Sequence, residues 1–409
     1  MKLTDIAEYV SDKISSDQIT LDEYVTTDSL LQNKRGRETA QNLPPVTCAL
    51  INFKQGDILV ANIRPYLKKV WYADSDGGCS SDVLVFRAKN GHDSNFLYAV
   101  LMQDAFFDYA MQGAKGSKMP RGDKDQIMRY EIPTFSTDEE ENIGKMVVDI
   151  TSKINLNRRI NDNLEAMAKQ LYDYWFVQFD FPNEEGKPYK SSGGAMVYNE
   201  RLKRDIPKNW MVENMIDFAD IKNGATPSTV DDTNYGGDIV WITPKDLSDQ
   251  KSKFIYYGER NITQAGFDSC STSMLPIDSV LMSSRAPIGL VSIAKHEVCT
   301  NQGFKSFVPH DLDDSIYLYY YIKHHIKQIE QLGSGTTFKE VSREDLCKFP
   351  ILIIGENHVY SQWVSLQKEI VNKQFVLTQE IRTLTKQRDE LLPLLMNGQA
   401  MVNYHLSAC

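Results

Sequence analysis

The chain has 409 residues, enough for two or three domains, and 42% hydrophobic with 24% charged residues is typical of a folded globular protein. Its net charge of −10 argues mildly against a nucleic-acid partner, because such proteins usually carry a basic surface. No stretch approaches the roughly 18 consecutive apolar residues of a membrane helix, the N-terminus lacks the apolar core of a signal peptide, and the cysteines form no C-x-x-C pair. These features predict a cytoplasmic protein with reduced cysteines and no membrane span.

The first part of the chain consists of short apolar runs separated by turn residues. GDILVANI (56–63) and DVLVFRA (82–88) are typical of β-strands, and NFLYAVLMQDAFFDYAM (95–111) predicts a short helix. Together they indicate an α+β globular domain.

A long helix follows. From Ile143, apolar residues recur every three or four positions, with Asn157 interrupting the seam, and Pro182 is expected to close the helix. The predicted seam comprises Val147, Ile150, Ile154, Ile160, Leu164, Met167 and Leu171. Residues 181–203 contain Pro, Gly and Ser without an apolar period, so they predict a surface linker.

The second part repeats this order. SVLMSS (279–284) and GLVSIAK (289–295) predict strands, and residues 315–332 predict a helix. A second long helix has its seam at Val359, Trp363, Leu366, Ile370, Leu377, Ile381, Leu384 and Leu391, and Pro393 is expected to close or bend it.

Matching segments recur at a nearly constant distance and indicate an internal duplication. Arg64 matches Arg285, Asp57 matches Asp278 and Val70 matches Val291 at an offset of 221 residues. Cys79 matches Cys299, and Leu164 and Leu171 match Leu384 and Leu391, at 220; Gly116 matches Gly335 at 219. The start of the chain resembles the segment from Trp210 at an offset nearer 210. Two unrelated amphipathic helices are the alternative.

Helices of about 36 to 40 residues are rods of roughly 55 to 60 Å. The linker allows parallel or antiparallel pairing. Antiparallel pairing would place two globular domains at opposite ends, related by a pseudo-twofold axis. Such an arrangement suits two short sites on one face of DNA, whose helical repeat is about 34 to 36 Å.

Candidate DNA contacts lie in loops at matching positions. An arginine at a strand end has the donors to read guanine, and Ser or Asn can read other base edges or hold phosphates, although each arginine can instead form a salt bridge within its own domain. The glycine turns, KGSKMPRG and GSGTTFKE, suit phosphate contact. The full set is Lys34, Arg35, Arg37, Asn62, Arg64, Lys68, Lys118, Arg121, Lys245, Ser283, Ser284, Arg285, Thr336, Thr337 and Lys339.

Motifs for catalysis are not found. The sequence lacks a G-x-x-x-x-G-K-[ST] loop and a G-x-G-x-x-G turn, NLPPV (42–46) lacks the pattern of an amino-methyltransferase, and no metal site is predicted. A nuclease or methyltransferase is therefore disfavoured. A non-catalytic scaffold that does not act on DNA is the remaining alternative.

The chain resembles the specificity (S) subunits of type I restriction-modification enzymes over essentially its whole length. The segments that carry this resemblance are 153–194, LTKQRDELLPLLMNGQ (384–399), residues 56–86, NGATPS (223–228) and WITPKDL (241–247). The resemblance implies two α/β target recognition domains, residues 1–136 and 205–354, each reading one half of a bipartite DNA target. It also implies a central spacer helix (137–180), a linker (181–204), a C-terminal spacer helix (355–398) and a tail (399–409), with the helices forming an antiparallel coiled coil.

The resemblance further implies the partners. They are double-stranded DNA, two adenine methyltransferase subunits that bind S-adenosylmethionine, and restriction subunits that use ATP and Mg. The chain itself is expected to hold no cofactor and to be non-catalytic.

Overall fold

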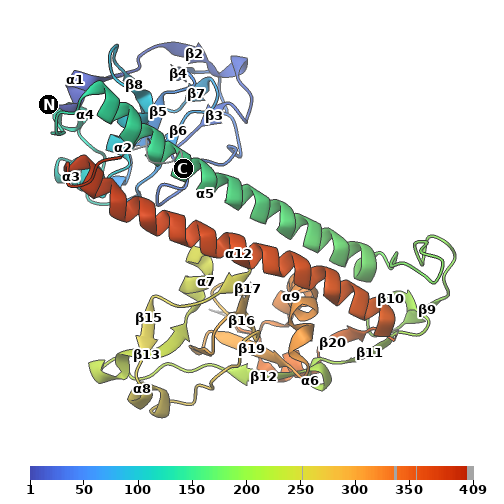
Figure 1. Ribbon diagram of the computed structural model, residues 1–409. Helices are drawn as coiled ribbons and strands as arrows, with labels where there is room; N and C mark the ends of the chain where they lie inside the picture. Colours follow the sequence, from blue (N-terminus) through green and yellow to red (C-terminus); the bar gives the residue numbers. More distant parts are fainter. Residues whose placement is uncertain (251, 336–338, 356, 403–409) are drawn as a thin grey trace, which may run out of the picture. The chain divides into compact units, whose positions relative to one another are not determined.

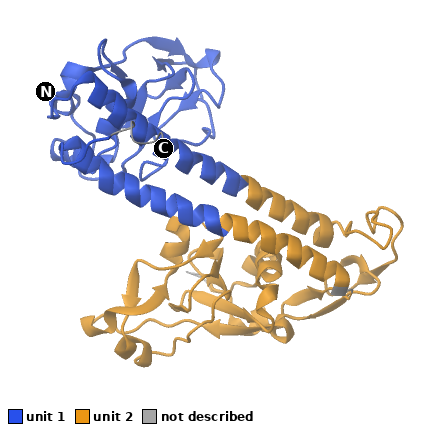
Figure 2. Ribbon diagram, in the orientation of Figure 1, with its two compact units in different colours: residues 1–162, 375–409 blue, residues 163–374 orange. Residues whose placement is uncertain are grey.

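The computed structural model describes residues 1–250, 252–335, 339–355 and 357–402. The chain divides into two compact units, unit 1 with residues 1–162 and 375–409 and unit 2 with residues 163–374 (Figure 2). Both boundaries fall within long helices, α5 (Thr137–Tyr172) and α12 (Asn357–Met396). Each unit therefore combines a globular part with a stretch of both helices (Figure 1).

The main sheet of unit 1 is antiparallel, with strand order β1-β8-β5-β6. Its strands are β1 (Ala7–Tyr9), β8 (Val83–Ala88), β5 (Ile58–Ala61) and β6 (Val70–Tyr72). Ile58 and Val60 belong to the cluster that includes helix residues such as Phe96, whereas Leu59 belongs to the cluster on the opposite face. Successive side chains of a strand point to opposite faces, so β5 is buried on both.

A second sheet of unit 1 has the order β2-β4-β7-β3. Its strands are β2 (Lys13–Ser15), β4 (Ala49–Phe53), β7 (Gly77–Cys79) and β3 (Tyr24–Val25). Phe53 and Cys79 join Leu59 in one buried cluster, so the two sheets share a core.

The main sheet of unit 2 repeats the strand order of the main sheet of unit 1 and adds β14 beside β17, whereas the second sheets of the two units differ. The main sheet of unit 2 runs β12-β19-β16-β17-β14, and a second sheet runs β15-β13-β18. The strands are β12 (Ala219–Asn223), β19 (Phe304–Pro309), β16 (Val280–Ser284), β17 (Ile288–Ala294), β14 (Phe254–Ile255), β15 (Arg260–Ile262), β13 (Tyr235–Ile242) and β18 (Cys299–Thr300). The four runs predicted as strands are confirmed as β5, β8, β16 and β17.

Hydrogen bonds correct part of the sequence alignment of the repeats. The amide of Ala73 donates to Asp57 O, and the amide of Ala294 donates to Ser279 O. Ser279, not Asp278, is therefore the counterpart of Asp57, and the offset at this strand is 222 rather than 221. The start of the chain was predicted to match the second unit at an offset near 210. The pairing of β1 with β8 and of β12 with β19 gives an offset of 212 between β1 and β12.

The predicted helix at 95–111 is two helices, α2 (Ser94–Leu101) and α3 (Asp104–Gln112), because Gln103 is extended. The helix predicted at 315–332 likewise divides, at His325, into α9 (Ser315–His324) and α10 (Ile326–Leu332). The remaining short helices are α1 (Leu3–Ile6), η1 (Ser16–Gln18), η2 (Pro65–Leu67), α4 (Lys124–Ile127), α6 (Met215–Phe218), η4 (Asp232–Asn234), α7 (Pro244–Gln250), α8 (Gln264–Asp268), η5 (Leu312–Asp314) and α11 (Arg343–Lys348).

The long helices end differently from the expectation. α5 continues as a π-helical turn, η3 (Asp173–Val177), and stops well before Pro182. Pro393 lies inside α12, which continues to Met396. Of the described helices, none is long and apolar enough to cross a membrane.

Within each unit, α5 and α12 run antiparallel. In unit 1, Asn157 Nδ2 donates to Glu380 Oε2 at 2.8 Å and Asn161 Nδ2 donates to Thr378 Oγ1 at 3.3 Å. In unit 2, Gln374 Nε2 donates to Glu165 Oε2 at 3.3 Å and Gln367 Nε2 donates to Ala168 O at 3.0 Å. Asn157 is buried, so it lies in the seam rather than interrupting it. Ile160, Met167 and Leu366 were predicted in the seam, but they are 38%, 54% and 43% exposed.

The C-terminal end of α12 completes the core of unit 1. Leu392, Leu395 and Met396 are buried in the same cluster as Leu3 and Phe96. The core of unit 1 therefore depends on residues from both ends of the chain.

The predicted surface linker has structure of its own. β9 (Met196–Asn199) pairs with β10 (Arg204–Pro207), and Phe181 is fully buried, stacked on Tyr189 and Trp210. β11 (Met211–Asn214) then pairs with β20 (Pro350–Ile353).

Candidate nucleic-acid interface

In each unit a strand-end loop pairs with a glycine turn. The strand-end loops are residues 62–65 after β5 and 284–287 at the end of β16; the glycine turns are residues 113–122 and the described residues of 332–341. In unit 1, Ile63 and Lys115 both form antiparallel bridges with Arg121. In unit 2, Arg285 and Ser334 both form antiparallel bridges with Glu340. Two of the sequence-predicted segments are thus brought together in each unit.

The fourth residue of each turn is a glycine with a positive φ, 99° at Gly116 and 122° at Gly335. Side chains other than glycine rarely adopt this conformation. The offset of 219 residues therefore matches two glycines that both have a positive φ.

Asn62 and the two serines lie inside rather than on the surface. Ser283 and Ser284 are 0% exposed, and Asn62 is 8% exposed. Ser283 Oγ donates to Pro287 O at 2.7 Å and accepts from the amide of Leu290 at 2.9 Å. The expectation that these side chains read base edges does not agree with this burial, so we assign Ser283 to holding the loop.

Arg64 has a left-handed backbone, with φ of 51°, and its amide donates to Pro120 O of the glycine turn at 2.7 Å. The side chain is partly buried, and Nε is buried without a hydrogen bond to any described residue. The next-but-one residue, Tyr66, is 50% exposed. Tyr66 is not among the contacts predicted from the sequence, although its place two residues after Arg64 makes it a candidate.

Arg285 has a partner within its own unit. Its Nη1 lies 3.6 Å from Glu340 Oε2, and Lys305 Nζ lies 3.0 Å from the other carboxylate oxygen of Glu340. The structure thus has the alternative arrangement, in which this arginine forms a salt bridge within its own domain. Glu340 stands in the sequence of the glycine turn, but its pairing across 55 residues is not visible without the fold.

The cations of the glycine turns are on the surface. Lys118 and Lys339 are exposed, and neither has an ion pair with a described residue. Arg121 is also exposed and lies 3.2 Å from Asp82 Oδ1. Exposed pairs of this kind contribute little, so Arg121 remains available to a phosphate. Thr336 and Thr337 lie outside the described residues.

The basic segment at 34–37 is mostly engaged in internal contacts. Lys34 is 6% exposed, and its Nζ lies 2.7 Å from Asp104 Oδ1, which Lys68 also contacts at 2.9 Å. Arg37 donates to Asp22 O at 2.6 Å and lies over the ring of Trp71.

Those contacts make Lys34 and Arg37 parts of the fold of unit 1 rather than free phosphate contacts. Arg35 is exposed and is the accessible cation of this segment among the described residues. Lys245 is exposed as well, and its hydrogen bond with Glu259 raises its pKa.

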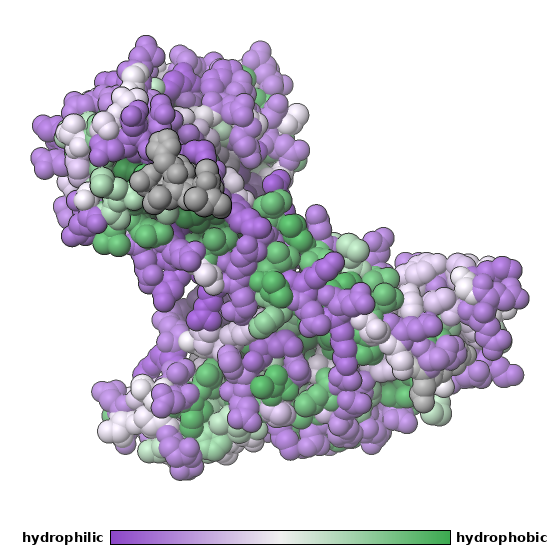
Figure 3. All heavy atoms as spheres, in the orientation of Figure 1, coloured by the Kyte–Doolittle hydropathy of each residue, from purple (hydrophilic) through white to green (hydrophobic). Residues whose placement is uncertain are grey.

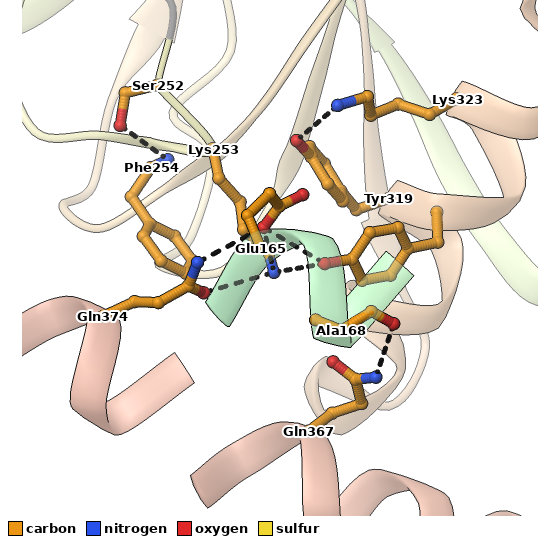
Figure 4. A network of polar contacts seen from close by, with 10 residues as sticks. Glu165, Ala168, Ser252, Lys253, Phe254, Tyr319, Lys323, Gln367 and Gln374 are labelled. Carbon is orange, nitrogen blue, oxygen red and sulfur yellow. Dashed lines mark hydrogen bonds and ion pairs between the residues drawn. The ribbon is translucent and has the colours of Figure 1, made fainter. Parts of the chain in front are cut away.

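In unit 2 a buried lysine connects the globular part to both long helices (Figure 4). Lys253 Nζ lies 3.0 Å from Glu165 Oε2 of α5, donates to Tyr320 Oη at 2.7 Å and to Gln374 Oε1 of α12 at 3.4 Å. Burial lowers the pKa of Lys253, and the charge of Glu165 opposes that effect. The network holds the globular part of unit 2 on the helices. No sequence motif predicted it.

Comparison with known proteins places this geometry in a family. The family model of the type I restriction modification DNA specificity domain matches residues 1–166 and 207–393. The chain therefore belongs to the family of type I restriction-modification specificity subunits, as its resemblance to that family predicted.

Two curated relatives carry names of that family. The chain is 43% identical over 143 residues to the type I restriction enzyme MjaIX specificity subunit of Methanocaldococcus jannaschii, which covers 34% of this chain and 33% of that protein. It is 24% identical over 405 residues to the type I restriction enzyme HindI specificity subunit of Haemophilus influenzae, with 85% and 87% covered.

A solved structure has the same fold. The crystal structure of a type I restriction-modification system S subunit from M. genitalium matches with a TM-score of 0.59 at 14% identity, covering 97% of this chain and 95% of that one. At this identity the likeness concerns the fold.

Proposed function

We propose that this chain is the DNA sequence-specificity subunit of a type I restriction-modification complex and that it reads a bipartite target. The observation that carries the proposal is the pairing of a strand-end loop with a glycine turn in both units, with Ile63 and Arg121 in one and Arg285 and Glu340 in the other. Each loop would read bases of one half-site, and exposed cations such as Lys118 and Lys339 would contact phosphates.

In this proposal residues 1–136 and 205–354 are the two target recognition domains. Residues 137–180 and 355–398 are spacer helices that form an antiparallel coiled coil about a pseudo-twofold axis, joined by 181–204 and followed by a tail, 399–409. A later residue of α5 contacts an earlier residue of α12: Asn157 contacts Glu380, and Ala168 contacts Gln367. This order supports antiparallel pairing. The helices would then set the number of unread base pairs between the half-sites.

The helices would also dock partner proteins. Leu156 of α5 is 44% exposed and Val376 of α12 is 62% exposed. Hydrophobic residues also appear at the surface over the long helices among mostly hydrophilic ones (Figure 3). Exposed apolar side chains grouped on a surface are typical of interaction sites.

We assign these surfaces to two adenine methyltransferase subunits, with restriction subunits joining the full complex. Those partners would supply catalysis with S-adenosylmethionine, ATP and Mg, in the cytoplasm, and this chain would be non-catalytic.

Sequencing the methylated adenines in a host that expresses this chain with its methyltransferase subunits tests the proposal. We expect methylation within one sequence of two defined parts separated by a fixed gap. Methylation without sequence preference, or at a single undivided site, contradicts it.

The net charge of −10 favours a second candidate, a two-domain scaffold that does not act on DNA. The two are separated by the affinity of the chain-methyltransferase complex for DNA. Phosphate contacts make that affinity fall steeply with salt, whereas a scaffold would show no DNA binding.

A further inference from the structure

The inference below rests on the proposed function and concerns which residue reads a base. Hydrogen bonds define which positions of the two strand-end loops correspond. Asn62 donates its amide to Asp82 O and accepts from the amide of Gly122, and Ser284 donates to Gly303 O and accepts from the amide of Val341. Asn62 and Ser284 are therefore counterparts.

Two residues further on, Arg64 corresponds to Ala286. Both have the left-handed backbone, with φ of 51° and 44°. Arg285 corresponds instead to Ile63, and both of these residues bridge the glycine turn of their own unit. The match of Arg64 with Arg285 in the sequence is therefore wrong by one position.

The two arginines also differ in their surroundings. Arg285 faces Glu340, whose carboxylate also binds the nearly buried Lys305, so its charge is matched within unit 2. Arg64 forms no hydrogen bond or ion pair through its side chain with a described residue, and its Nε is buried. A buried guanidinium nitrogen without an acceptor is unfavourable unless a ligand supplies one.

The backbone at Arg64 adds a second cost. The left-handed conformation is unfavourable for a residue with a Cβ, and because Ala286 shares it, the two loops differ in the side chain held there rather than in the backbone. A glycine would relieve this strain, yet the loop has an arginine, whose side chain has five hydrogen-bond donors. Two residues further on lies the exposed Tyr66.

We propose that Arg64 is a base-reading residue of unit 1, that its target is a guanine, and that unit 2 has no counterpart to it. The guanidinium would donate to O6 and N7 of guanine. Arg285 would act as a positioning residue that holds the glycine turn of unit 2 through Glu340. The two half-sites would then be read by different chemistry despite the shared strand order.

The test uses the complete chain in complex with its methyltransferase subunits. Wild type, Arg64→Gly, Arg64→Lys and Arg285→Ala are compared by the rate of adenine methylation on duplexes in which each base pair of the mapped target is replaced in turn. Glycine suits the left-handed backbone, so Arg64→Gly removes the side chain without adding strain. Thermal unfolding of each variant verifies that it is folded.

We expect Arg64→Gly to lose roughly 5- to 150-fold discrimination at a G·C pair of one half-site and none at the other. Arg64→Lys retains part of it, and Arg285→Ala lowers the methylation rate on all duplexes alike without relaxing the preference for any base, as a positioning residue should. Equal loss of rate on all duplexes for Arg64→Gly makes Arg64 a phosphate contact and overturns the inference, as does relaxed base preference in Arg285→Ala. A wild-type complex without a bipartite preference overturns the proposed function itself.

Discussion

Lys253 Nζ lies 3.0 Å from Glu165 Oε2, and only 5% of the lysine side chain is exposed. Tyr320 and Gln374 supply further oxygen atoms to the same ammonium group. A buried cation is stable only while such acceptors surround it. The position of the globular part of unit 2 on its stretches of α5 and α12 therefore depends on an ion pair that is costly to break from one side.

Replacing Lys253 by methionine leaves Glu165 without its counter-charge. We expect the free energy of unfolding to fall by about 2 to 4 kcal/mol, at or below the usual range for a buried pair because Glu165 is 31% exposed. Urea unfolding measures the change. Lys348→Met is the matched control, because its pair with Glu344 is exposed on both sides and its loss should hardly change the free energy of unfolding. Equal effects of the two substitutions would show that the buried pair contributes no more to stability than the exposed pair.

His325 should make the stability of unit 2 depend on pH. Burial lowers the pKa of His325 from 6.5 to about 4, and its Nδ1 lies 2.8 Å from Tyr321 O. Between pH 6.5 and 4 the unfolded chain binds a proton that the folded chain does not. Stability therefore falls as pH falls through this window, by at most about 1.4 kcal/mol per pH unit for this group.

Unfolding free energies measured between pH 4 and 8 check this effect. We expect His325→Gln to reduce the slope more than His324→Gln, because His324, whose pKa burial also lowers, is the more exposed of the two. An identical slope in wild type and His325→Gln would contradict the assignment.

Lys118 should contribute affinity for DNA without sequence preference. It is exposed, and in the described structure no carboxylate forms an ion pair with it. We expect Lys118→Ala to weaken binding of the complex to all duplexes alike and to reduce the slope of log K against log salt by about 1. Lys187→Ala in the linker serves as control and should leave the slope unchanged. An effect confined to particular sequences would make Lys118 a base contact.

The spacing of the proposed target should follow helix length. Seven residues inserted both after Asp162 and after Gln374 add about 10 Å to each helix and nearly preserve the phase of the contacts. At about 3.4 Å per base pair, the gap between the methylated half-sites should lengthen by about three base pairs. Sequencing of methylated adenines measures the gap. An unchanged gap would contradict a helical spacer.

Apolar runs bounded by turn residues predicted the strands β5, β8, β16 and β17, and apolar residues recurring every three or four positions predicted the two long helices. These patterns misplaced side chains in elements that are buried on more than one face. Ser283 and Ser284 are polar residues in an apolar run, so the sequence predicted that they are exposed. Every residue of β16 is buried, and both serines are therefore inside the domain.

The repeat was predictable, but its register was not. Between Pro65 and Val70 unit 1 has one residue more than unit 2 has between Pro287 and Val291. The identity of Arg64 and Arg285 favoured the wrong alignment, and only backbone hydrogen bonds reveal the extra residue. Partners such as Glu340 and Asp104 were missed because ion pairs between distant segments form only after the chain has folded.

Unit 1 contains both ends of the chain, whereas unit 2 is a single continuous stretch. During synthesis the ribosome therefore releases every residue of unit 2 before Leu392, Leu395 and Met396 exist to fill the core around Leu3 and Phe96. The first unit to emerge is thus the last to become complete. In a chain truncated within α12, the apolar core of unit 1 would remain exposed to water.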